Sequence, residues 1–400
     1  MLTREANERL TQTGPGTPMG NLLRRYWHPI STVKELDAEP VLAVRVLSEN
    51  LALYRNEQGV MGLVAERCPH RGASLAYGIP EDNGLRCPYH GWLFSPEGRC
   101  LEQPAEPASS TFHNRIRTPA YPVQEMGGLI WAYLGPQPAP LLPRWDICVR
   151  EDVDRDIGIS RIPCNWLQPM ENSMDPMHFE WLHGVFGNYV MKRQGKPAAM
   201  NPRHHEEIAF DIFDYGIIKR RRLQGDAIDS DDWVIGHPIL FPNILAVGDS
   251  HRPSFQIRVP IDDTNTLHYW YRATPREPGA EPQPVSVYDA EWVHPNGRLW
   301  VETIPGQDMM AWITQGGISE RTTERLGTSD KGVILLRSVL LDEVEKVERG
   351  EDPMGVIRDP ARNEPMIVIP RECDALKAFE IKREVVGAGP ARGKTVGATS

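Results

Sequence analysis

The chain has 400 residues, of which 40% are hydrophobic and 24% are charged, and its formal net charge is −10. This length exceeds what one hydrophobic core usually serves, so we expect two domains. The acidic balance argues against a nucleic-acid partner, and no apolar run approaches the roughly 18 residues of a membrane span. Residues 1–5 include two charged residues, Arg4 and Glu5, and lack the apolar core of a secretory signal. We therefore expect a cytoplasmic protein.

The first third of the chain predicts a helical lead-in followed by a β domain. Residues 1–26 form the lead-in, with a short apolar patch at Leu22 and Leu23. From Trp27 to about Gly135, short runs rich in β-branched and aromatic residues are bounded by Gly, Pro and Asn, as strands are. The clearest runs are residues 40–47, 51–54 and 129–134.

Two short loops within this β region carry a matched set of metal-binding residues. Cys68 and His70 form a C-x-H motif, and Cys87 and His90 form a C-x-x-H motif. Two Cys on one iron and two His on the other are the ligands of a Rieske [2Fe–2S] cluster. Replacing thiolates by neutral imidazoles raises the potential to roughly −150 to +300 mV. The loops therefore predict a one-electron carrier.

The alternative interpretation of these loops is a structural zinc site. Zinc modules usually pair Cys with Cys and His with His, whereas each loop here holds one of each. The flanking glycines, Gly72 and Gly91, allow backbone N–H groups to approach the sulfurs, which favours the cluster. The other cysteines stand singly and are expected to be buried thiols in a reducing compartment; they are Cys100, Cys148, Cys164 and Cys373.

A proline-dense segment, residues 135–143, indicates a stiff linker at a domain boundary. Beyond it, residues 167–186 have a helical pattern and contain His178 and His183. Two His with a carboxylate form the facial triad of non-haem Fe(II) sites, which leaves positions open for O₂. Two ordinary histidines on a half-buried helix are the alternative, but an electron carrier upstream needs an acceptor.

The spacing of these histidines has a structural consequence. On an ideal α-helix they would lie about 140° apart, which is too far round to share one ion. We therefore expect the segment to be under-wound or bent, as π-bulges at functional sites are. Asp175 lies three residues before His178, where its carboxylate could hydrogen-bond and orient that ring.

The rest of the chain predicts a sheet followed by a long helix. Strand candidates lie near 206–223, 233–248, 253–260 and 266–273, and residues 275–285 have the composition of an exposed loop. A helix is expected from about Asp330 to Gly350, with an apolar stripe at Val333, Leu336, Leu340, Val344 and Val347. Residues 386–400 are expected to be disordered. No phosphate-binding loop in a strand–helix context is present, so nicotinamide binding is not expected.

The loops CPHRGASL and CPYHGW, the motif N-W-x₄-E-N-x₂-D-x₂-H-x₄-H from Asn165, and residues 317–330 resemble one family closely. It is the oxygenase component of Rieske non-haem iron oxygenases, in the phthalate dioxygenase-like branch, and the resemblance covers nearly the whole chain. It implies an α+β fold with an antiparallel β Rieske domain, residues 27–137. Residues 1–26 and 138–385 would form a catalytic domain of helix-grip type, an antiparallel sheet wrapped on the long C-terminal helix.

The resemblance also implies the residues of the catalytic centre and its electron route. His178, His183 and Asp308 would bind mononuclear Fe(II); spacing alone leaves open the rival carboxylates, which are Glu302, Glu320 and Asp330. Family members form homotrimers or multiples of three. Asp175 would then connect the iron to the cluster of the neighbouring subunit through His90 or His70. Asn172 would help to shape the pocket, and a separate NAD(P)H-dependent flavin and iron–sulfur reductase would supply electrons.

The expected reaction is hydroxylation of a small aromatic substrate with O₂, and the branch suggests an aromatic acid or an aryl ether. A monooxygenase or O-demethylase on the same scaffold is one alternative, and a non-catalytic Rieske electron carrier is another. Lys219 and Arg221 lie in a basic run that ends a strand, so one or both could bind a substrate carboxylate. The alternative, which a run of like charges favours, is a solvated basic face. Arg258 and His251 are similar candidates.

Overall fold

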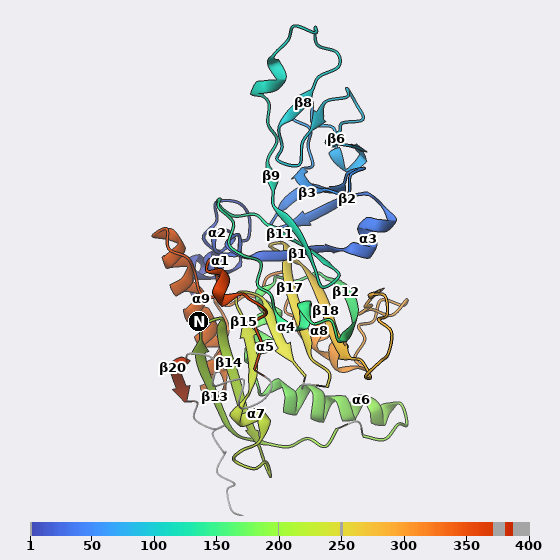
Figure 1. Ribbon diagram of the computed structural model, residues 1–400. Helices are drawn as coiled ribbons and strands as arrows, with labels where there is room; N and C mark the ends of the chain where they lie inside the picture. The colour runs from blue at the N-terminus through green and yellow to red at the C-terminus, as the bar shows by residue number, and fades with distance from the viewer. Residues whose placement is uncertain (1, 199, 249–250, 371–380, 387–400) are drawn as a thin grey trace, which may run out of the picture.

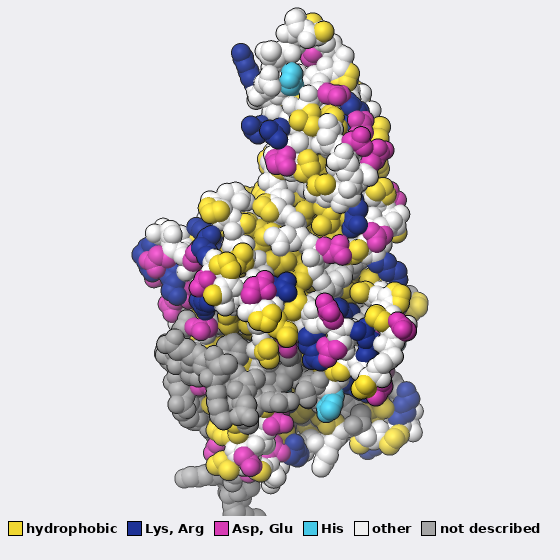
Figure 2. All heavy atoms as spheres, in the orientation of Figure 1, with side chains coloured by type: hydrophobic (Ala, Val, Ile, Leu, Met, Phe, Trp, Pro, Cys, Tyr) yellow, Lys and Arg dark blue, Asp and Glu magenta, His cyan; other side chains and the backbone are white. Residues whose placement is uncertain are grey.

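The computed structural model describes residues 2–198, 200–248, 251–370 and 381–386. Figure 1 shows a narrow upper part, from about residue 40 to residue 120, above a broader body of sheet and helices. In Figure 2, acidic and basic side chains are interspersed over the face in view, so neither sign dominates it. No helix in the described ranges is long and apolar enough to span a membrane. The predicted disordered tail lies outside the described residues, apart from its first residue.

The upper part consists of two small antiparallel sheets, and the strands predicted at 40–47 and 51–54 are confirmed within the first. The first sheet contains, in order, β2 (Val41–Val46), β3 (Glu49–Arg55), β4 (Met61–Ala65) and β9 (Ala120–Tyr121). The second contains β5 (Ile79–Glu81), β6 (Gly84–Arg86), β7 (Leu93–Phe94) and β8 (Cys100–Glu102). Two 3₁₀ turns accompany them, η1 (Leu75–Tyr77) and η2 (Phe112–Arg115).

A third sheet lies where the two parts meet. It consists of β1 (Trp27–Thr32), β11 (Leu129–Tyr133) and β10 (Val123–Met126), and α3 (Val33–Ala38) follows β1. The run predicted at 129–134 is thus confirmed as β11. The two-residue turn between β2 and β3 has φ of 49° at Leu47 and 65° at Ser48, the left-handed pair of a tight hairpin turn. Their N–H groups donate to Pro260 O (2.8 Å) and Ile261 O (2.9 Å), which joins the upper part to the body.

The body is built on a nine-stranded sheet, and the expected antiparallel arrangement is confirmed, apart from one parallel edge pair. In spatial order the strands are β19 (Ser286–Asp289), β12 (Val153–Ile162), β18 (Asn265–Pro275), β17 (Ser254–Asp262), β16 (Ile244–Val247), β15 (His237–Leu240), β14 (Gly216–Leu223), β13 (His205–Phe213) and β20 (Ile381–Val386). The candidate near 206–223 is therefore a hairpin, β13 and β14.

One strand prediction needs correction at its start. Residues 233–236 do not extend a strand; α7 (Asp231–Val234) precedes β15, with two acidic residues in its first turn. Acidic side chains favour a helix N-terminus, and Gly236, at φ 72°, turns the chain into β15. The sequence analysis did not predict β12, whose first half carries three consecutive charged residues, Asp154, Arg155 and Asp156.

The predicted C-terminal helix is confirmed as α9 (Lys331–Glu348), and all five residues of its apolar stripe are buried. It begins in close contact with the segment that carries the two histidines. A Cβ placed on Gly332 would lie 2.2 Å from Met174 O and 2.5 Å from the Phe210 ring, so glycine is required at this crossing. The helix therefore fixes the distance between the sheet and the residues that precede His178.

The helical lead-in is confirmed as α1 (Arg4–Thr11) and α2 (Pro18–Leu23), and Arg9 pairs with Glu348 at the end of α9. The proline-dense segment is not a projecting spacer. Leu141 N donates to Ile357 O (2.8 Å), and Trp27 Nε1 donates to Pro140 O (3.0 Å). The remaining short elements are α4 (Asp146–Val149), η4 (Thr328–Asp330) and η5 (Pro360–Arg362).

Smaller predictions have mixed outcomes. Residues 277–284 are exposed, as expected for the loop predicted near 275–285. Cys100, Cys148 and Cys164 are buried, as predicted, and Cys373 lies outside the described residues. The proposed domain boundaries, at 26/27 and 137/138, stay a prediction.

Candidate metal centres

The two Cys–His loops have the same backbone design. The N–H of Cys68 donates to Ala73 O, and the carbonyl of Cys68 accepts from the N–H of Gly72, both at 2.8 Å. Cys87 repeats this pattern with Trp92 (2.8 Å) and Gly91 (3.0 Å). Gly72 and Gly91 have φ of 77° and 72°, a left-handed conformation that glycine adopts without strain. Each turn therefore holds its Cys in the same backbone pattern, whereas His70 lies two residues after Cys68 and His90 lies three residues after Cys87.

The loops place their sulfurs inside and their imidazoles outside. Cys68 and Cys87 are 2% exposed, whereas His70 is exposed and His90 is half-buried. The rings of His70 and His90 lie 4.6 Å apart, edge to face, and His70 stacks on Trp92 at 4.4 Å. Burial and the neighbouring Cys87 raise the pKa of the Cys68 thiol to about 11. A positively charged metal is what such a thiol pair needs to ionise.

The geometry disfavours the zinc alternative. Only one group of three or more His, Cys, Asp or Glu donors in the described ranges converges within 4.8 Å, and it contains none of the loop residues. Ligands of one tetrahedral zinc would converge in this way. The loop donors instead form a buried sulfur pair and an outer imidazole pair, as a two-iron cluster requires.

The histidine segment contains a π-helix, which confirms the expected under-winding. α5 (Leu167–Met174) ends at Asp175; His178 then precedes η3 (Phe179–Phe186), a π-helix that continues into α6 (Gly187–Arg193). A π-helix repeats its hydrogen bonds every five residues, so residues five apart share a face. The rings of His178 and His183 accordingly lie 5.2 Å apart at 83°.

Asp308 completes the group from α8 (Ile304–Thr314), a helix that the sequence did not reveal. Its Oδ1 lies 3.2 Å from His183 Nε2 and 3.8 Å from His178 Nε2. Donor atoms of the three residues fall within 4.8 Å of one another. Asp308 Oδ1 is buried without a hydrogen-bond partner. A buried carboxylate oxygen facing two imidazoles fits a metal ion well.

The three rival carboxylates have other partners. Glu302 accepts from Val301 N and contacts His294, Glu320 accepts from Thr322, and Asp330 accepts from Gly327 N. The structure brings none of them into the group formed by His178 and His183. Asp308 is therefore the carboxylate that the fold positions.

Gln307, the residue before Asp308, holds one of the histidines. Its Oε1 lies 2.9 Å from His183 Nδ1, and its Nε2 donates to Val301 O (3.0 Å). Because the amide oxygen can only accept, His183 Nδ1 carries the proton and the lone pair of Nε2 faces Asp308. Burial opposes charge on His183, but contacts with Asp308 and Gln307 outweigh it and raise its pKa.

Asp175 faces His178 but does not hydrogen-bond to it as the sequence suggested. Its Oδ2 lies 3.8 Å from His178 Nδ1, which is too long for a hydrogen bond. Its Oδ1 instead accepts from Met177 N (2.7 Å), because the chain turns at Asp175 where α5 ends. Burial raises the pKa of Asp175 and lowers that of His178 to about 3. Asn172 is half-buried in α5, one turn before Asp175.

The solvated basic face that the run 219–222 suggested is wrong for Lys219. This residue is 6% exposed, and burial lowers its pKa to about 7. It lies on the inner side of β14, where the charges of Arg221, Asp175 and Asp308 also act on it. Arg221 pairs with Asp232 (2.7 Å) and lies over the Phe179 ring, whereas Arg220 bonds Asp211. Tertiary burial thus overrides the charge pattern.

The other substrate candidates differ in burial. Arg258, on β17, is 1% exposed and feels the charge of Asp308. His251 lies before β17 and is exposed, so it does not share that buried environment.

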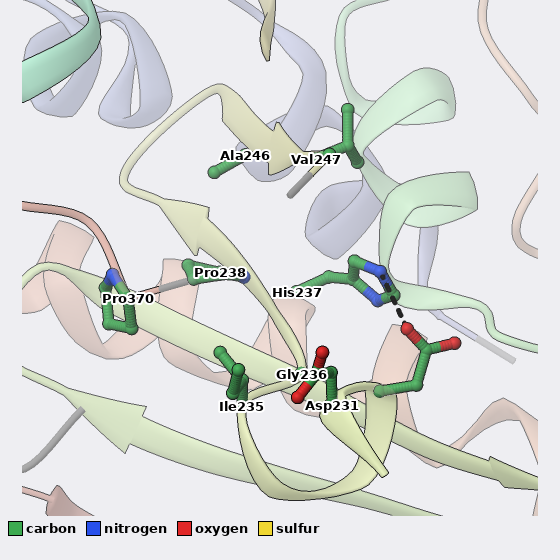
Figure 3. Close-up of a pocket in the computed structure, with 10 residues that line it drawn as sticks. Asp231, Ile235, Gly236, His237, Pro238, Ala246, Val247 and Pro370 are labelled. Carbon is green, nitrogen blue, oxygen red and sulfur yellow. Dashed lines mark ion pairs between the residues drawn. The ribbon is translucent and has the colours of Figure 1, made fainter. Parts of the chain in front are cut away.

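A surface hollow of about 280 Å³ adjoins the basic strand at α7, β15 and β16. In Figure 3 the dashed line runs from the His237 ring, which lies 3.5 Å from Asp232. His237 is also the cross-strand partner of Lys219. Asp232, at the rim of this hollow, therefore contacts both His237 and Arg221. Arg221 thus already has a carboxylate partner within the protein.

Two family models match the chain: the Rieske [2Fe-2S] domain over residues 26–122, and a LigXa C-terminal domain like model over residues 296–380. Over 394 residues the chain is 42% identical to the 5,5'-dehydrodivanillate O-demethylase oxygenase subunit of Sphingobium sp. (strain NBRC 103272 / SYK-6), covering 96% of this chain and 91% of that protein. It is 32% identical to the phthalate 4,5-dioxygenase oxygenase subunit of Pseudomonas putida, covering 89% of each.

A solved structure of NdmA from Pseudomonas putida CBB5 with caffeine has the same fold, with a TM-score of 0.63 at 23% identity over 83% of this chain and 94% of that one. Fold and metal-ligand groups together define an iron-dependent oxidoreductase with two redox centres. The chain belongs to the oxygenase subunits of the Rieske non-haem iron oxygenases, as the resemblance implied. Its cofactors are a Rieske [2Fe–2S] cluster and a mononuclear iron.

Proposed function

We propose that this subunit oxygenates a small aromatic acid or aryl ether with O₂. Electrons come from a separate NAD(P)H-dependent flavin and iron–sulfur reductase, which places the protein in the cytoplasm with its reductant. The observation that carries the proposal is the presence, in one chain, of the paired Cys–His loops and the buried group His178, His183 and Asp308. A non-catalytic electron carrier would have no use for the second group.

In this proposal each centre has a defined set of ligands. Cys68 and Cys87 hold the inner iron of the cluster, and His70 and His90 hold the outer iron, as their burial suggests. His178, His183 and Asp308 hold the mononuclear iron. When bound, that iron supplies the oxygen chemistry.

The protein's own residues prepare the second centre for its metal. Gln307 keeps His183 in the tautomer whose Nε2 can bind, and Asp308 supplies one negative charge in a buried setting. His183 and Asp308 have side chains that are 3% and 10% exposed, which limits the access of bulk water.

The electron route in this proposal crosses between subunits of a homotrimer or a multiple of three. In Figure 1 the upper part that carries the cluster loops stands at the opposite end from α6, which continues η3. Tyr89, beside the cluster histidines, is 57% exposed, and Trp181 and Tyr189, beside the iron group, are 59% and 55% exposed. Exposed aromatic residues of this kind are typical of interfaces. Asp175 would bridge the two centres across that contact.

Mixed oligomers test the route. His178→Ala subunits lack the mononuclear iron, and Cys87→Ser subunits lack the cluster, so each alone should be inactive. Co-expressed and co-purified on two different tags, they should regain turnover, because one subunit's cluster meets the other's iron. Mixed oligomers that stay inactive, with the intact centres confirmed by spectroscopy, would contradict an inter-subunit route.

Arg258 is the basic residue that we propose as the substrate's carboxylate partner. It is buried, carries no acidic partner within 4.0 Å in the described ranges, and lies close enough to Asp308 to feel its charge. Lys219 and Arg221 border the same inner face, and Asn172 is proposed to shape the pocket. His251 remains a candidate at the surface.

A second reaction type, O-demethylation, is favoured by one observation: the relative named for that reaction is 42% identical, against 32% for the phthalate dioxygenase. The two reactions differ in product. Dioxygenation yields a cis-diol, whereas demethylation of a methoxyarene yields a phenol and formaldehyde.

The deciding experiment is a substrate screen with a surrogate reductase, in which O₂ uptake is matched to product. Metal analysis should find about three irons per chain, two in the cluster and one mononuclear. His178→Ala should keep the cluster's visible spectrum and lose turnover together with about one iron. Hydroxylation retained in that variant would overturn the site assignment, and two irons in the wild type would favour the electron carrier.

A further inference from the structure

Beside Asp308, hydrogen-bonding atoms of three buried side chains have no partner. They are Arg258 Nε, both ring nitrogens of His268, and Trp312 Nε1. His268 and Trp312 are 0% exposed and Arg258 is 1% exposed. Buried polar atoms in folded proteins are nearly always paired, so several such atoms in one place indicate a ligand.

The three side chains come together from two strands and one helix. Arg258 on β17 and His268 on β18 are direct cross-strand partners, so their side chains share one face of the sheet. Trp312 lies one turn after Asp308 on α8, which puts both on the same side of that helix. The Trp312 ring lies 5.6 Å from the His268 ring and 6.0 Å from the Arg258 guanidinium carbon. The group therefore adjoins the carboxylate of the iron site.

Within the described residues no carboxylate pairs directly with Arg258, and the charge of Asp308 reaches it only from beyond the 4.0 Å of an ion pair. Arg258 donates to Gln256 Oε1 (2.5 Å), to Gln256 O (3.2 Å) and toward Met170 Sδ (4.0 Å), all of them neutral. Burial lowers the pKa of Arg258 to about 9, so it still carries its proton at neutral pH. Burial also lowers the pKa of His268 well below its usual value, so that ring is neutral and keeps one N–H donor. A buried cation without an anion is costly unless a ligand supplies the charge.

We propose that Arg258, His268 and Trp312 form the binding site for the carboxylate of an aromatic acid, and that His268 is a specificity-determining residue. This inference rests on the proposed function. It extends that function by adding His268 and Trp312, which the sequence analysis did not single out. A carboxylate only accepts hydrogen bonds, and the three side chains offer a guanidinium and two neutral N–H groups. Because this site lies next to Asp308, a substrate whose carboxylate is bound there would have its aromatic ring held near the iron.

The surroundings of His268 suit an aromatic ligand. Its ring stacks on Trp270 at 4.1 Å and 20°. Trp270 also lines a cavity of about 350 Å³, together with Tyr288, Trp300 and Met309, the residue that follows Asp308. The same wall carries Arg272 and two carboxylates, Asp289 and Glu291. The polar group thus lies directly behind an aromatic-walled cavity of a size suited to a small ligand.

If His268 had a purely structural role, the effect of replacing it on the stability of the ligand-free protein would differ. A ring with two unpaired nitrogens packs no better than a phenyl ring of similar shape, and it leaves polar atoms without partners. If His268 serves a ligand, His268→Phe should leave the ligand-free protein as stable as the wild type, or more stable. Binding sites often retain residues that do not favour stability.

The test compares acids with their carboxamides on the iron-loaded holoenzyme. The probes are phthalate, phenoxybenzoate and 5,5'-dehydrodivanillate, each paired with its amide, and Kd is measured by calorimetry. The wild type should prefer the acid. His268→Phe should weaken acid binding about tenfold to a hundredfold, as for a lost hydrogen bond to a charged group, and leave amide binding nearly unchanged.

Two further variants make the result specific. Tyr269→Phe is the matched control, because Tyr269 is buried on the same strand but faces the opposite side of the sheet, and acid binding should not change. His268→Gln retains an N–H donor and should recover part of the loss. Acid affinity in His268→Phe within about twofold of the wild type, or a marked loss of ligand-free Tm, would overturn the inference.

The outcomes separate this inference from the proposed function. If the wild type binds an acid and the His268→Phe variant binds it equally well, the carboxylate site is rejected and the proposed function stands. A wild type that prefers the amides rejects the carboxylate site alone. A wild type that binds none of the three acids, and that oxygenates no aromatic acid or aryl ether in the substrate screen, rejects both.

Discussion

His178 and His183 lie five residues apart, and the π-helical turn between them brings their rings to 5.2 Å at 83°. An α-helical turn would direct the two rings to different sides. The unusual helix is therefore part of the metal site, and residues that hold it in place should affect iron binding without touching the iron.

Gln307 should control iron affinity through His183. Gln307→Leu keeps the side-chain shape but removes the acceptor of the His183 Nδ1 proton. Loss of such an outer partner typically lowers metal affinity 10–100-fold. Chelator competition on the mononuclear iron measures this change, and the cluster absorbance should not change. Gln315→Leu, at the exposed end of the same helix, is the control. Equal affinity in both variants would contradict the role.

Glu180 should hold the π-helix against the sheet. It is 4% exposed, and its carboxylate bonds His204 Nδ1 (2.5 Å) and His205 N (3.1 Å) on or beside β13. His204 is exposed, but Glu180→Ala leaves the buried N–H of His205 unpaired, so we expect a loss of about 1–3 kcal/mol in unfolding free energy. Denaturant titration measures it, and a nitrosyl EPR spectrum of the iron should broaden. Glu207→Ala, at a half-exposed ion pair on β13, should cost far less.

Glu171, the one charged residue of α5, should be important for stability. Its two oxygens accept from Arg321 at 2.8 Å each, and Oε1 also accepts from Arg337 Nε at 2.6 Å. Arg321 is 0% exposed and loses its carboxylate partner in Glu171→Ala, whereas Arg337 keeps Glu324, so the expected cost is about 3–5 kcal/mol. Thermal and urea unfolding test this. Glu348→Ala, which breaks the exposed pair with Arg9, should cost under about 1 kcal/mol.

His28 should make the joint between the two parts sensitive to acid. It is 0% exposed; its Nε2 donates to Leu23 O (2.8 Å), and its Nδ1 accepts from Asn243 Nδ2 (3.3 Å). Burial lowers its pKa to about 4. Between the unfolded pKa near 6.5 and this value, the unfolded chain binds the extra proton, so stability falls as pH falls.

The expected size of this effect is about 2 kcal/mol between pH 7 and pH 5, from one group alone. His28→Gln should remove that part of the pH dependence, so the stability gap between wild type and variant narrows on acidification. Urea titrations at both pH values measure the gap. A gap that stays constant would show that His28 does not titrate in this range.

The features that depend on the spacing of residues along the chain were predicted correctly from the sequence. The cluster loops follow from four ligands and two glycines within 24 residues. The under-wound helix follows from the angle between His178 and His183, and α9 from the stripe at Val333 to Val347.

What depends on tertiary contact was not predictable. Asp308 stands on α8, whose sequence has no clear polar and apolar faces, and only the packing of α8 on η3 distinguishes it from Glu302 or Glu320. Lys219 has a surface-like sequence context, yet the sheet buries it. His268 gave no signal at all, because a single His in a strand is most often an ordinary core residue.

The outward position of His70 and His90 affects how the protein should be handled. In the proposed assembly, dilution that separates the subunits would expose His70 and His90 to water, where oxidants could reach the cluster and no neighbouring iron would accept its electrons. Loss of colour on dilution in air, and its protection at high protein concentration, would then report the assembly state directly.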